Sequence, residues 1–302
     1  MCEFERLIDL AGHTERQRPC IAVAAAEHED TQRCLSEINK RHLADALLFG
    51  DRAKILQIAA RVSYTVTDEQ IIDAKDHEQA CALAVTAVKE GRAHILMKGI
   101  VHTSVFGKSL LDKSSGLVLP DGLISHLGLF DLPYYHKPLF VTDAAINIAP
   151  DVEKKRSILF NALHTMRRMG IQKPKVAVIG PVETVNPKIP STMDAMRLVK
   201  EQQEYGVFGD CEIEGPYAID VALSARAAAI KGIVSGVAGN ADLLLCPNLD
   251  TANAVNKLMI LVDGCRSAGI VVGLSVPVVL TSRSDTDMNR FYSICMAIRS
   301  ML

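Results

Sequence analysis

Side chains able to hold an anion follow an apolar run near the C-terminus. The run Val271–Leu280 stops abruptly, and Ser282, Arg283, Asp285 and Asp287 come after it. An arginine beside a hydroxyl at the end of a buried strand suits a phosphoryl or carboxylate group, because the planar guanidinium can donate two parallel hydrogen bonds. The structural alternative is an internal ion pair of Arg283 with Asp285 or Asp287.

A second group of candidate residues follows the apolar run His94–Met97. Lys98 and Gly99 stand directly after it, so a cation lies where the backbone can approach a ligand closely. Phosphate or pyrophosphate is the expected ligand, and ordinary solvated lysines are the alternative. The candidates here are Lys98, Gly99, His102, Thr103 and Lys108.

Carboxylate and amide groups mark the segment after the run Leu139–Val141. Thr142, Asp143 and Asn147 follow it, with Asp143 and Asn147 four positions apart around an expected turn. They could orient a ligand, or Asp143 and Asp151 could cap the local backbone, as Asp and Asn often do at such turns.

Two further segments carry weaker signals. Gly215-Pro216 is expected to open a helix that would place Asp220 and Ser224 on one face, toward a ligand, solvent or another subunit. A glycine-rich stretch before Asn248, with Asn253 and Lys257 one turn apart, suits an anion at a helix start. It lacks the nucleotide-binding fingerprints, so it predicts neither an ATP nor a dinucleotide site.

Metal-binding and covalent-nucleophile patterns are absent from the sequence. It contains no HExxH, CxxC or GxSxG motif, and its eight cysteines are scattered. Cys246 stands between Leu245 and Pro247 and is expected to lie in the core. We therefore expect no metal site.

The elements that must position these groups alternate between strand and helix. Helical patterns lie between most of the apolar runs, and Ser191 is expected to cap a helix that begins near it. The expected strands are Cys20–Ala25, Ala46–Phe49, His94–Met97, Leu139–Val141, Val176–Ile179, Leu243–Cys246 and Val271–Leu280, and the clearest helices are His77–Lys89, Asp151–Met169 and Met193–Gln203.

This alternation predicts an α/β fold with mostly parallel sheets. Because parallel strands end at one edge of a sheet, the polar segments after the strands should gather there. Every one of these segments is polar or contains Gly or Pro. The 302 residues are enough for two domains of ordinary size.

The composition argues against some classes of binding partner. A formal net charge of −2 gives no global positive field for nucleic acid or an anionic membrane. No apolar segment reaches the length of a membrane span, and the N-terminal segment lacks the apolar stretch of a signal peptide. The expected state is a soluble, cytoplasmic protein with reduced thiols, no nucleic-acid partner and no membrane partner.

Several of these segments together resemble a known family, in the same order along the chain. The segments MKGIVHTS, TDAAINIAPD, GPYAIDVALS, SGVAGNADLLLCPNLDTANAVNK and VPVVLTSRSD are similar to those of phosphate acetyl/butyryl transferases, and the butyryl branch is the nearer one. The resemblance extends over nearly the whole chain, and TDAAINIAPD and LTSRSD carry most of it.

The resemblance implies a fold and an assembly. It implies two α/β/α domains like those of isocitrate dehydrogenase, with a cleft between them, and a homodimer or larger homo-oligomer. The expected division is residues 1–138 with 276–302 in one domain and residues 139–275 in the other.

The resemblance also implies a reaction. Members of the family move an acyl group between coenzyme A and phosphate by direct thiol attack, so acyl-CoA, CoA, phosphate and acyl phosphate are the expected partners. Coenzyme A would be a substrate, and no tightly bound cofactor is expected. Butyryl-CoA is the first expectation for the acyl donor, and acetyl-CoA is the alternative.

Residue roles follow the same resemblance. Ser282 and Arg283 match the family's serine-arginine pair, which binds phosphate and stabilises developing charge. The acetyl branch has its aspartate base seven positions beyond that serine, where this chain has Asn289, so Asp285 or Asp287 is expected instead. The candidate catalytic residues are Ser282, Arg283, Asp285 and Asp287, and the candidate substrate-binding residues are Lys98, Gly99, His102, Thr103, Lys108, Thr142, Asp143, Asn147, Asp220, Asn248, Asn253 and Lys257.

Two other functions are compatible with the same architecture. One is a dehydrogenase that uses a metal ion and a nicotinamide cofactor, which would need a cluster of metal-binding aspartates. The other is a ligand-sensing module that keeps the cleft but has lost the chemistry.

Overall fold

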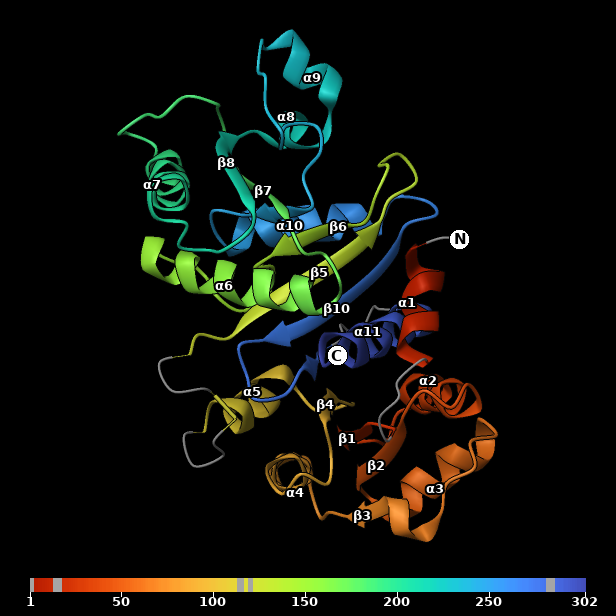
Figure 1. Cartoon of the computed structure of the whole chain (residues 1–302). Helices are drawn as coiled ribbons and strands as arrows, with labels where there is room; N and C mark the ends of the chain where they lie inside the picture. Colours follow the sequence, from red (N-terminus) through yellow and green to blue (C-terminus); the bar gives the residue numbers. More distant parts are fainter. Residues whose placement is uncertain (1–2, 13–17, 113–116, 119–121, 281–285) are drawn as a thin grey trace. The chain divides into compact units, whose positions relative to one another are not determined.

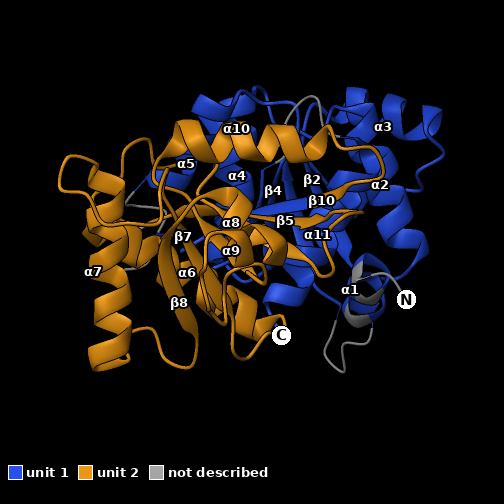
Figure 2. Ribbon diagram, turned by 90° about the horizontal axis from the view of Figure 1, so that it is seen from above, with its two compact units in different colours: residues 1–122, 268–302 blue, residues 123–267 orange. Residues whose placement is uncertain are grey.

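A computed structural model describes residues 3–12, 18–112, 117–118, 122–280 and 286–302 of the chain (Figure 1). The chain divides into two compact units (Figure 2). Unit 1 comprises Met1–Gly122 and Ala268–Leu302, and unit 2 comprises Leu123–Ser267. The domain division expected from the sequence, with limits after residues 138 and 275, stays a prediction, as does the cleft between domains.

Unit 1 is an α/β unit built on parallel strands. Its strand order is β3-β2-β1-β4-β11-β10, and among the pairings of these described strands the one between β10 and β11 is antiparallel while the others are parallel. The strands are β1 (Cys20–Ala24), β2 (Asp45–Gly50), β3 (Ile71–Asp73), β4 (Ile95–Lys98), β10 (Arg266–Val272) and β11 (Val278–Val279). The helices are α1 (Glu3–Gly12), α2 (Glu29–Lys40), α3 (Arg52–Arg61), the 3₁₀ helix η1 (Asp68–Gln70), α4 (His77–Lys89), α5 (Thr103–Leu111) and α11 (Asp287–Ser300).

Unit 2 repeats the same architecture. Its strand order is β5-β6-β9-β7-β8, parallel except between β5 and β6. The strands are β5 (Ser125–Asp131), β6 (Leu139–Thr142), β7 (Lys175–Ile179), β8 (Glu212–Tyr217) and β9 (Leu243–Leu245). The helices are α6 (Val152–Arg168), α7 (Pro190–Tyr205), α8 (Ile219–Leu223), α9 (Ala225–Ile230) and α10 (Leu249–Ile260).

Helix α6 shows how local sequence sets these elements. The Asp151 carboxylate accepts a hydrogen bond from Lys154 N at 2.8 Å and caps the helix. Arg167 and Arg168 occupy the last turn, where cations offset the partial negative charge of the helix end. The buried face contributes Ile158, Leu159, Ala162, Leu163 and Met166 to unit 2. The predicted helix and the predicted capping role of Asp151 are confirmed.

Strand register places the ends of the parallel strands side by side. In unit 2, Leu245 of β9 pairs with both Thr142 of β6 and Val178 of β7. In unit 1, Ala24 of β1 pairs with Lys98 of β4. The segments that follow these strands therefore emerge from common sheet edges, as the alternating pattern predicts.

The structure corrects three local predictions. The run Val271–Leu280 is two antiparallel strands, because Gly273 adopts a φ of 87° and Pro277, which lacks an N–H, precedes β11. Gly215 and Pro216 lie within β8, so they open no helix. Helix α7 begins at Pro190, with Ile189 at the N-cap, so Ser191 lies inside its first turn instead of capping it.

The position of Gly215 in β8 has a steric reason. Its φ is 148°, and a Cβ atom there would lie 2.5 Å from the carbonyl oxygen of Val178 on the adjacent strand. The following helix α8 has only five residues, and Ser224 caps α9 by accepting a hydrogen bond from Ala227 N. Asp220 and Ser224 therefore do not share one helix face, contrary to the prediction.

Candidate functional site

Lys98 ends β4 and is only 5% exposed. Its ammonium group donates hydrogen bonds to the carbonyl oxygens of Gly99, at 3.2 Å, and Val101, at 3.0 Å. Lys98 is therefore a buried cation that organises the loop after β4, and the solvated-lysine alternative is wrong for it. A Cβ atom at Gly99 would lie 1.9 Å from the carbonyl oxygen of Ala25, so no side chain fits there.

The other candidates near β4 belong to α5 and its N-terminus. His102 occupies the N-cap position, and Thr103 is the first helical residue. Both are exposed, as is Lys108 in the last turn. The N-terminus of α5 lies at the same sheet edge as the end of β4, in agreement with the predicted arrangement.

The predicted catalytic segment is described only in part. Ser282, Arg283 and Asp285 lie outside the described residues. Asp287 is the first residue of α11, and the hydroxyl group of Thr286 caps that helix by accepting a hydrogen bond from Asn289 N at 3.1 Å. The Asp287 carboxylate is about half exposed and lies 3.7 Å from the guanidinium of Arg290.

In unit 2, Asp143 organises the loop after β6. Its carboxylate is buried and accepts five hydrogen bonds, from the N–H groups of His126, Ala145, Ile146 and Asn147 and from the side-chain amide of Asn147. These distances are between 2.6 and 3.1 Å. This geometry favours the structural role for Asp143 that the sequence left open.

Neighbouring candidates support the same loop. Thr142 donates its hydroxyl to the carbonyl oxygen of His126 at 2.8 Å. Asn253 of α10 donates to the carbonyl oxygen of Ala144 at 3.1 Å, and Lys257 is exposed one turn further along that helix. The structure thus brings Thr142, Asp143, Asn147 and Asn253 together.

Asp220 belongs to a different group of charges. It is exposed on α8, and its carboxylate lies 3.3 Å from the ammonium of Lys231. Lys231 also pairs with Glu183 at 2.8 Å, and these partners raise its pKa. Asp220 thus takes part in a surface ion cluster.

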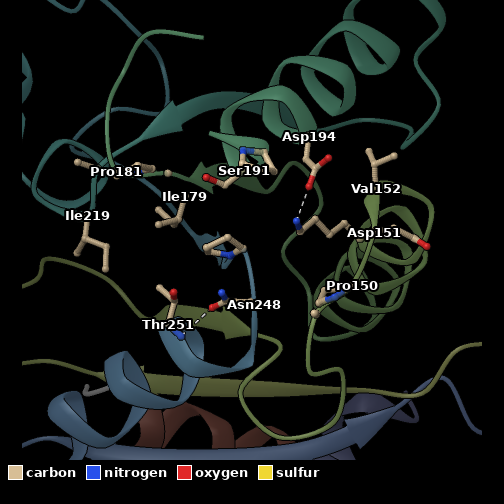
Figure 3. Close-up of a pocket in the computed structure, with 16 residues that line it drawn as sticks. Pro150, Asp151, Val152, Ile179, Pro181, Ser191, Asp194, Ile219, Asn248 and Thr251 are labelled. Atoms are coloured by element: carbon tan, nitrogen blue, oxygen red, sulfur yellow. Dashed lines mark hydrogen bonds and ion pairs between the residues drawn. The ribbon is translucent and has the colours of Figure 1, made fainter. Parts of the chain in front are cut away.

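A pocket of about 930 Å³ lies at the strand-end edge of unit 2 (Figure 3). It borders the ends of β7 and β9 and the N-termini of three long helices, α6, α7 and α10. Such termini favour anions, because their first N–H groups and the helix dipole point toward the opening. Its lining residues are Ala149, Pro150, Asp151, Val152, Lys155, Ile179, Gly180, Pro181, Pro190, Ser191, Asp194, Ala218, Ile219, Pro247, Asn248 and Thr251.

The pocket wall contains a buried ion pair between two helices. Lys155 of α6 is 5% exposed, and its ammonium lies 2.5 Å from the carboxylate of Asp194 on α7 (Figure 3). Asn248 faces the same pocket and caps α10 by accepting a hydrogen bond from Thr251 N at 2.9 Å. Apolar groups such as Ile179 and Ile219 complete the lining, so the pocket places an ion pair and helix N-termini beside apolar surface.

Sequence reasoning found Asn248 but missed Lys155, Asp194 and Ser191 as lining residues. Lys155 and Asp194 are 39 positions apart on two amphipathic helices, so no local motif joins them. A buried lysine in the first turns of a helix is unusual, and no local sequence pattern showed that Lys155 would be buried.

Cys246 follows β9 at the same edge. It is 3% exposed, and burial raises the pKa of its thiol to about 12. A thiol with such a pKa is protonated at neutral pH and is a poor nucleophile. The prediction that Cys246 belongs to the core is confirmed.

Two further features, a metal site and a membrane helix, concern only the residues that the structure describes. Within those ranges, no cluster of three or more His, Cys, Asp or Glu side chains is placed to hold a metal ion. Among the same residues, no helix is both long and apolar enough to cross a membrane.

Comparison with known proteins gives consistent similarities. Residues 77–298 match the family model described as phosphate acetyl/butaryl transferase. A phosphate butyryltransferase from Clostridium acetobutylicum is 39% identical over 277 residues, 92% of this chain and 91% of that protein. A phosphate acetyltransferase from Thermotoga maritima is 35% identical over 97% of this chain and 98% of its own. The solved structure of a branched-chain phosphotransacylase from Enterococcus faecalis V583 matches with a TM-score of 0.82 at 28% identity, over 93% of this chain and 98% of that chain.

Proposed function

The chain belongs to the phosphate acetyl/butaryl transferase family, and on this premise we propose that it converts butyryl-CoA and phosphate to butyryl phosphate and CoA. Transfer of an acyl group between coenzyme A and phosphate is the activity of the family. The butyryl group is the finer part of the proposal, and it is supported by the 39% identity to a phosphate butyryltransferase over most of both chains. Acetyl-CoA is the alternative substrate, since an acetyltransferase relative is 35% identical.

The chemistry sets three requirements for the site. In the direction of acyl-CoA formation, the S–H bond of CoA breaks, and its proton passes to a base. The sulfur then bonds to the acyl carbon, and the C–O bond to phosphate breaks as phosphate leaves with the electron pair. The site therefore needs a base, donors for the tetrahedral oxyanion and cations for the departing phosphate.

Ser282 and Arg283 are the proposed phosphate-binding pair, and Asp285 or Asp287 is the proposed base. The position of Asp287 supports this assignment, because it begins α11 at the helix end that attracts anions and remains partly exposed to a substrate. Val279, the last residue of β11, pairs with Met97, and Met97 directly precedes Lys98. Strand β11, which precedes the catalytic segment in the sequence, is therefore paired with the strand that ends in the predicted cation.

The strand-end pocket of unit 2 is the proposed site for an anionic part of coenzyme A. One observation carries this proposal: residues from the N-terminal turns of three long helices line one pocket, and its wall also contains the buried Lys155 ammonium paired with Asp194. Coenzyme A carries a diphosphate and a 3′-phosphate, and helix N-termini bind phosphate groups well. Its apolar atoms can contact the aliphatic lining near Ile179 and Ile219.

Several further features belong to the same proposal. Direct thiol attack needs no tightly bound cofactor, so activity should survive dialysis against a metal chelator. Seven free cysteines among the described residues and a coenzyme A substrate support a cytoplasmic location. A homodimer or larger homo-oligomer is also proposed, from family resemblance. No nucleic-acid or membrane partner is proposed.

The decisive experiment is phosphate-dependent release of CoA from acyl-CoAs of increasing chain length. We expect the highest kcat/KM with butyryl-CoA, because one methylene in an apolar pocket is worth about 1–3 kcal/mol of discrimination. A maximum at acetyl-CoA would overturn the butyryl assignment alone. Tight CoA binding without turnover would overturn the enzyme proposal and favour the ligand-sensing alternative.

A further inference from the structure

Arg290 of α11 has a buried guanidinium shared between two carboxylates. Its side chain is 4% exposed, and Nη1 lies 3.2 Å from Asp30 Oδ2 and 3.7 Å from Asp287 Oδ1. Asp30 lies in the first turn of α2, and Asp287 begins α11, one turn before Arg290. One cation therefore joins the first turns of two helices in unit 1.

The exposed fractions of the three side chains indicate that the arginine is held in place more firmly than the two carboxylates. The two carboxylates are 43% and 45% exposed, whereas the guanidinium has almost no contact with water. Burying a cation is costly unless acidic partners offset the lost hydration, so this guanidinium stays where both carboxylates can reach it. An exposed aspartate at a helix start has several rotamers available, and the ion pair favours those near Arg290. At 3.7 Å, the charge of Arg290 therefore favours one direction of the Asp287 carboxylate.

A second contact fixes the same pair of helices. The guanidinium of Arg41, at the C-cap of α2, lies 5.2 Å above the ring of Phe291, the residue after Arg290. This contact stabilises the packing of α2 on α11 without involving Asp287. The chain therefore offers a matched pair of arginines between these helices, one touching the candidate base and one not.

We propose that Arg290 is a positioning residue that orients Asp287 to accept the proton of the CoA thiol. This inference rests on the proposed function, and it adds a residue that neither the motifs nor the family resemblance single out. The proton leaves sulfur for an Asp287 oxygen while sulfur bonds to the acyl carbon and phosphate departs. Arg290 takes no part in these bond changes and acts only through the orientation of Asp287.

The test compares Arg290→Met, Arg290→Lys, Asp287→Asn and the double variant Arg290→Met/Asp287→Asn. We expect Arg290→Met to lower kcat by roughly ten- to a hundredfold, because misplacing a reacting group by about 1 Å has effects of this size. The KM values for CoA and acyl phosphate should stay within about threefold of wild type. Arg290→Lys should recover part of kcat, since its ammonium keeps the charge but not the fork of donors. The double variant should be no slower than Asp287→Asn.

Arg41→Met is the matched control, and thermal unfolding is recorded for every variant. We expect it to lower stability but to leave kcat near wild type. Additive losses in the double variant would overturn the inference, because Arg290 would then act independently of Asp287. Equal kcat in Arg41→Met and Arg290→Met would also overturn it by showing a purely structural role. Failure of the proposed function is distinguishable, because wild-type protein would then release no CoA with phosphate.

Discussion

Lys155 and Asp194 are the residues at which the pocket of unit 2 is most sensitive to change. Their ion pair lies between α6 and α7, and Lys155 is almost fully buried whereas Asp194 is 23% exposed. A buried pair of this kind adds little net stability, yet removal of one partner leaves an uncompensated charge. Its value in this position is a fixed ammonium group at the pocket wall.

Replacement of Lys155 by Met should weaken coenzyme A binding. We expect KM for CoA to rise by roughly tenfold, equivalent to about 1.4 kcal/mol, because a charged contact to phosphate is lost. Steady-state kinetics with varied CoA would measure it. In Lys155→Met, the Asp194 carboxylate loses its partner, so the double variant Lys155→Met/Asp194→Asn removes that unpaired charge as well and leaves only the effect of the lost contact to phosphate. The control is Lys154→Met, at an exposed neighbouring position. An unchanged KM in both Lys155 variants would contradict this role for the pocket.

Single residues also show which parts of the site could be predicted from the sequence alone. Asp151 was predictable as a cap because its partner, Lys154 N, is three residues away. Lys98 was recognised as a candidate, but its burial was not, because its carbonyl partners depend on the path of the loop after β4. Lys155 and Asp194 meet only through helix packing, so no sequence spacing could have revealed them.

At the scale of elements, the loop after β6 depends on a single carboxylate. Asp143 satisfies the N–H groups of three successive loop residues, Ala145 to Asn147, and of His126 on β5. A buried N–H without an acceptor is costly, so one side chain replaces the hydrogen bonds that a strand or helix would supply. The loop can therefore change direction sharply while remaining ordered.

Asp143→Asn should lower the free energy of unfolding by about 1–3 kcal/mol, since an amide turns one acceptor into a donor that faces N–H groups. Urea unfolding would measure the change. Asp151→Asn is the matched control, because Asn caps helices about as well as Asp, and its effect should stay within about 0.5 kcal/mol. Equal effects of the two substitutions would contradict the role assigned to the Asp143 loop.

Among the elements themselves, buried parallel strands were the most predictable. Six predicted strands agree with β1, β2, β4, β6, β7 and β9 to within one residue at either end, because apolar runs between helical patterns are distinctive. The run Val271–Leu280 failed because its composition does not show that Gly273 reverses the chain. Strand β5 was missed, since its polar and glycine residues hide a segment that is buried along nearly its whole length.

Across the whole molecule, burial protects the thiols. It raises the pKa of each of the seven cysteines that the structure describes, to about 11 for Cys20 and about 12 for Cys246 and Cys295. Since the folded chain holds these protons more tightly than the unfolded chain, this contribution to stability is complete below about pH 9. It is lost as pH rises toward the raised values.

In the native protein, the cysteines that the structure describes should accordingly react slowly with a thiol reagent such as DTNB at pH 8. Raising the thiol pKa from its ordinary value near 9 to about 12 lowers the thiolate fraction of Cys246 roughly a thousandfold, and we expect this residue to react at least about tenfold more slowly than in guanidinium chloride. Mass spectrometry after timed labelling would identify the modified residues. Rapid native labelling of Cys246 would contradict its burial and the view that catalysis needs no enzyme thiol.

The α/β architecture and the family were predictable at this scale, and both are confirmed. The order of polar segments along the chain carried that information, because each segment follows a strand of a parallel sheet. The catalytic roles within the site stay predictions, since three of the four proposed catalytic residues, Ser282, Arg283 and Asp285, lie outside the described part of the chain.

The division of unit 1 into two stretches has a consequence for biosynthesis. Residues 123–267 are continuous, so a ribosome completes unit 2 while unit 1 still lacks β11 and α11. The nascent β4 then has β1 on one side and an open edge on the other, where β11 will pair. Until the final segment emerges from the exit tunnel, the edge of β4 that pairs with β11 in the folded protein has no partner strand from that segment.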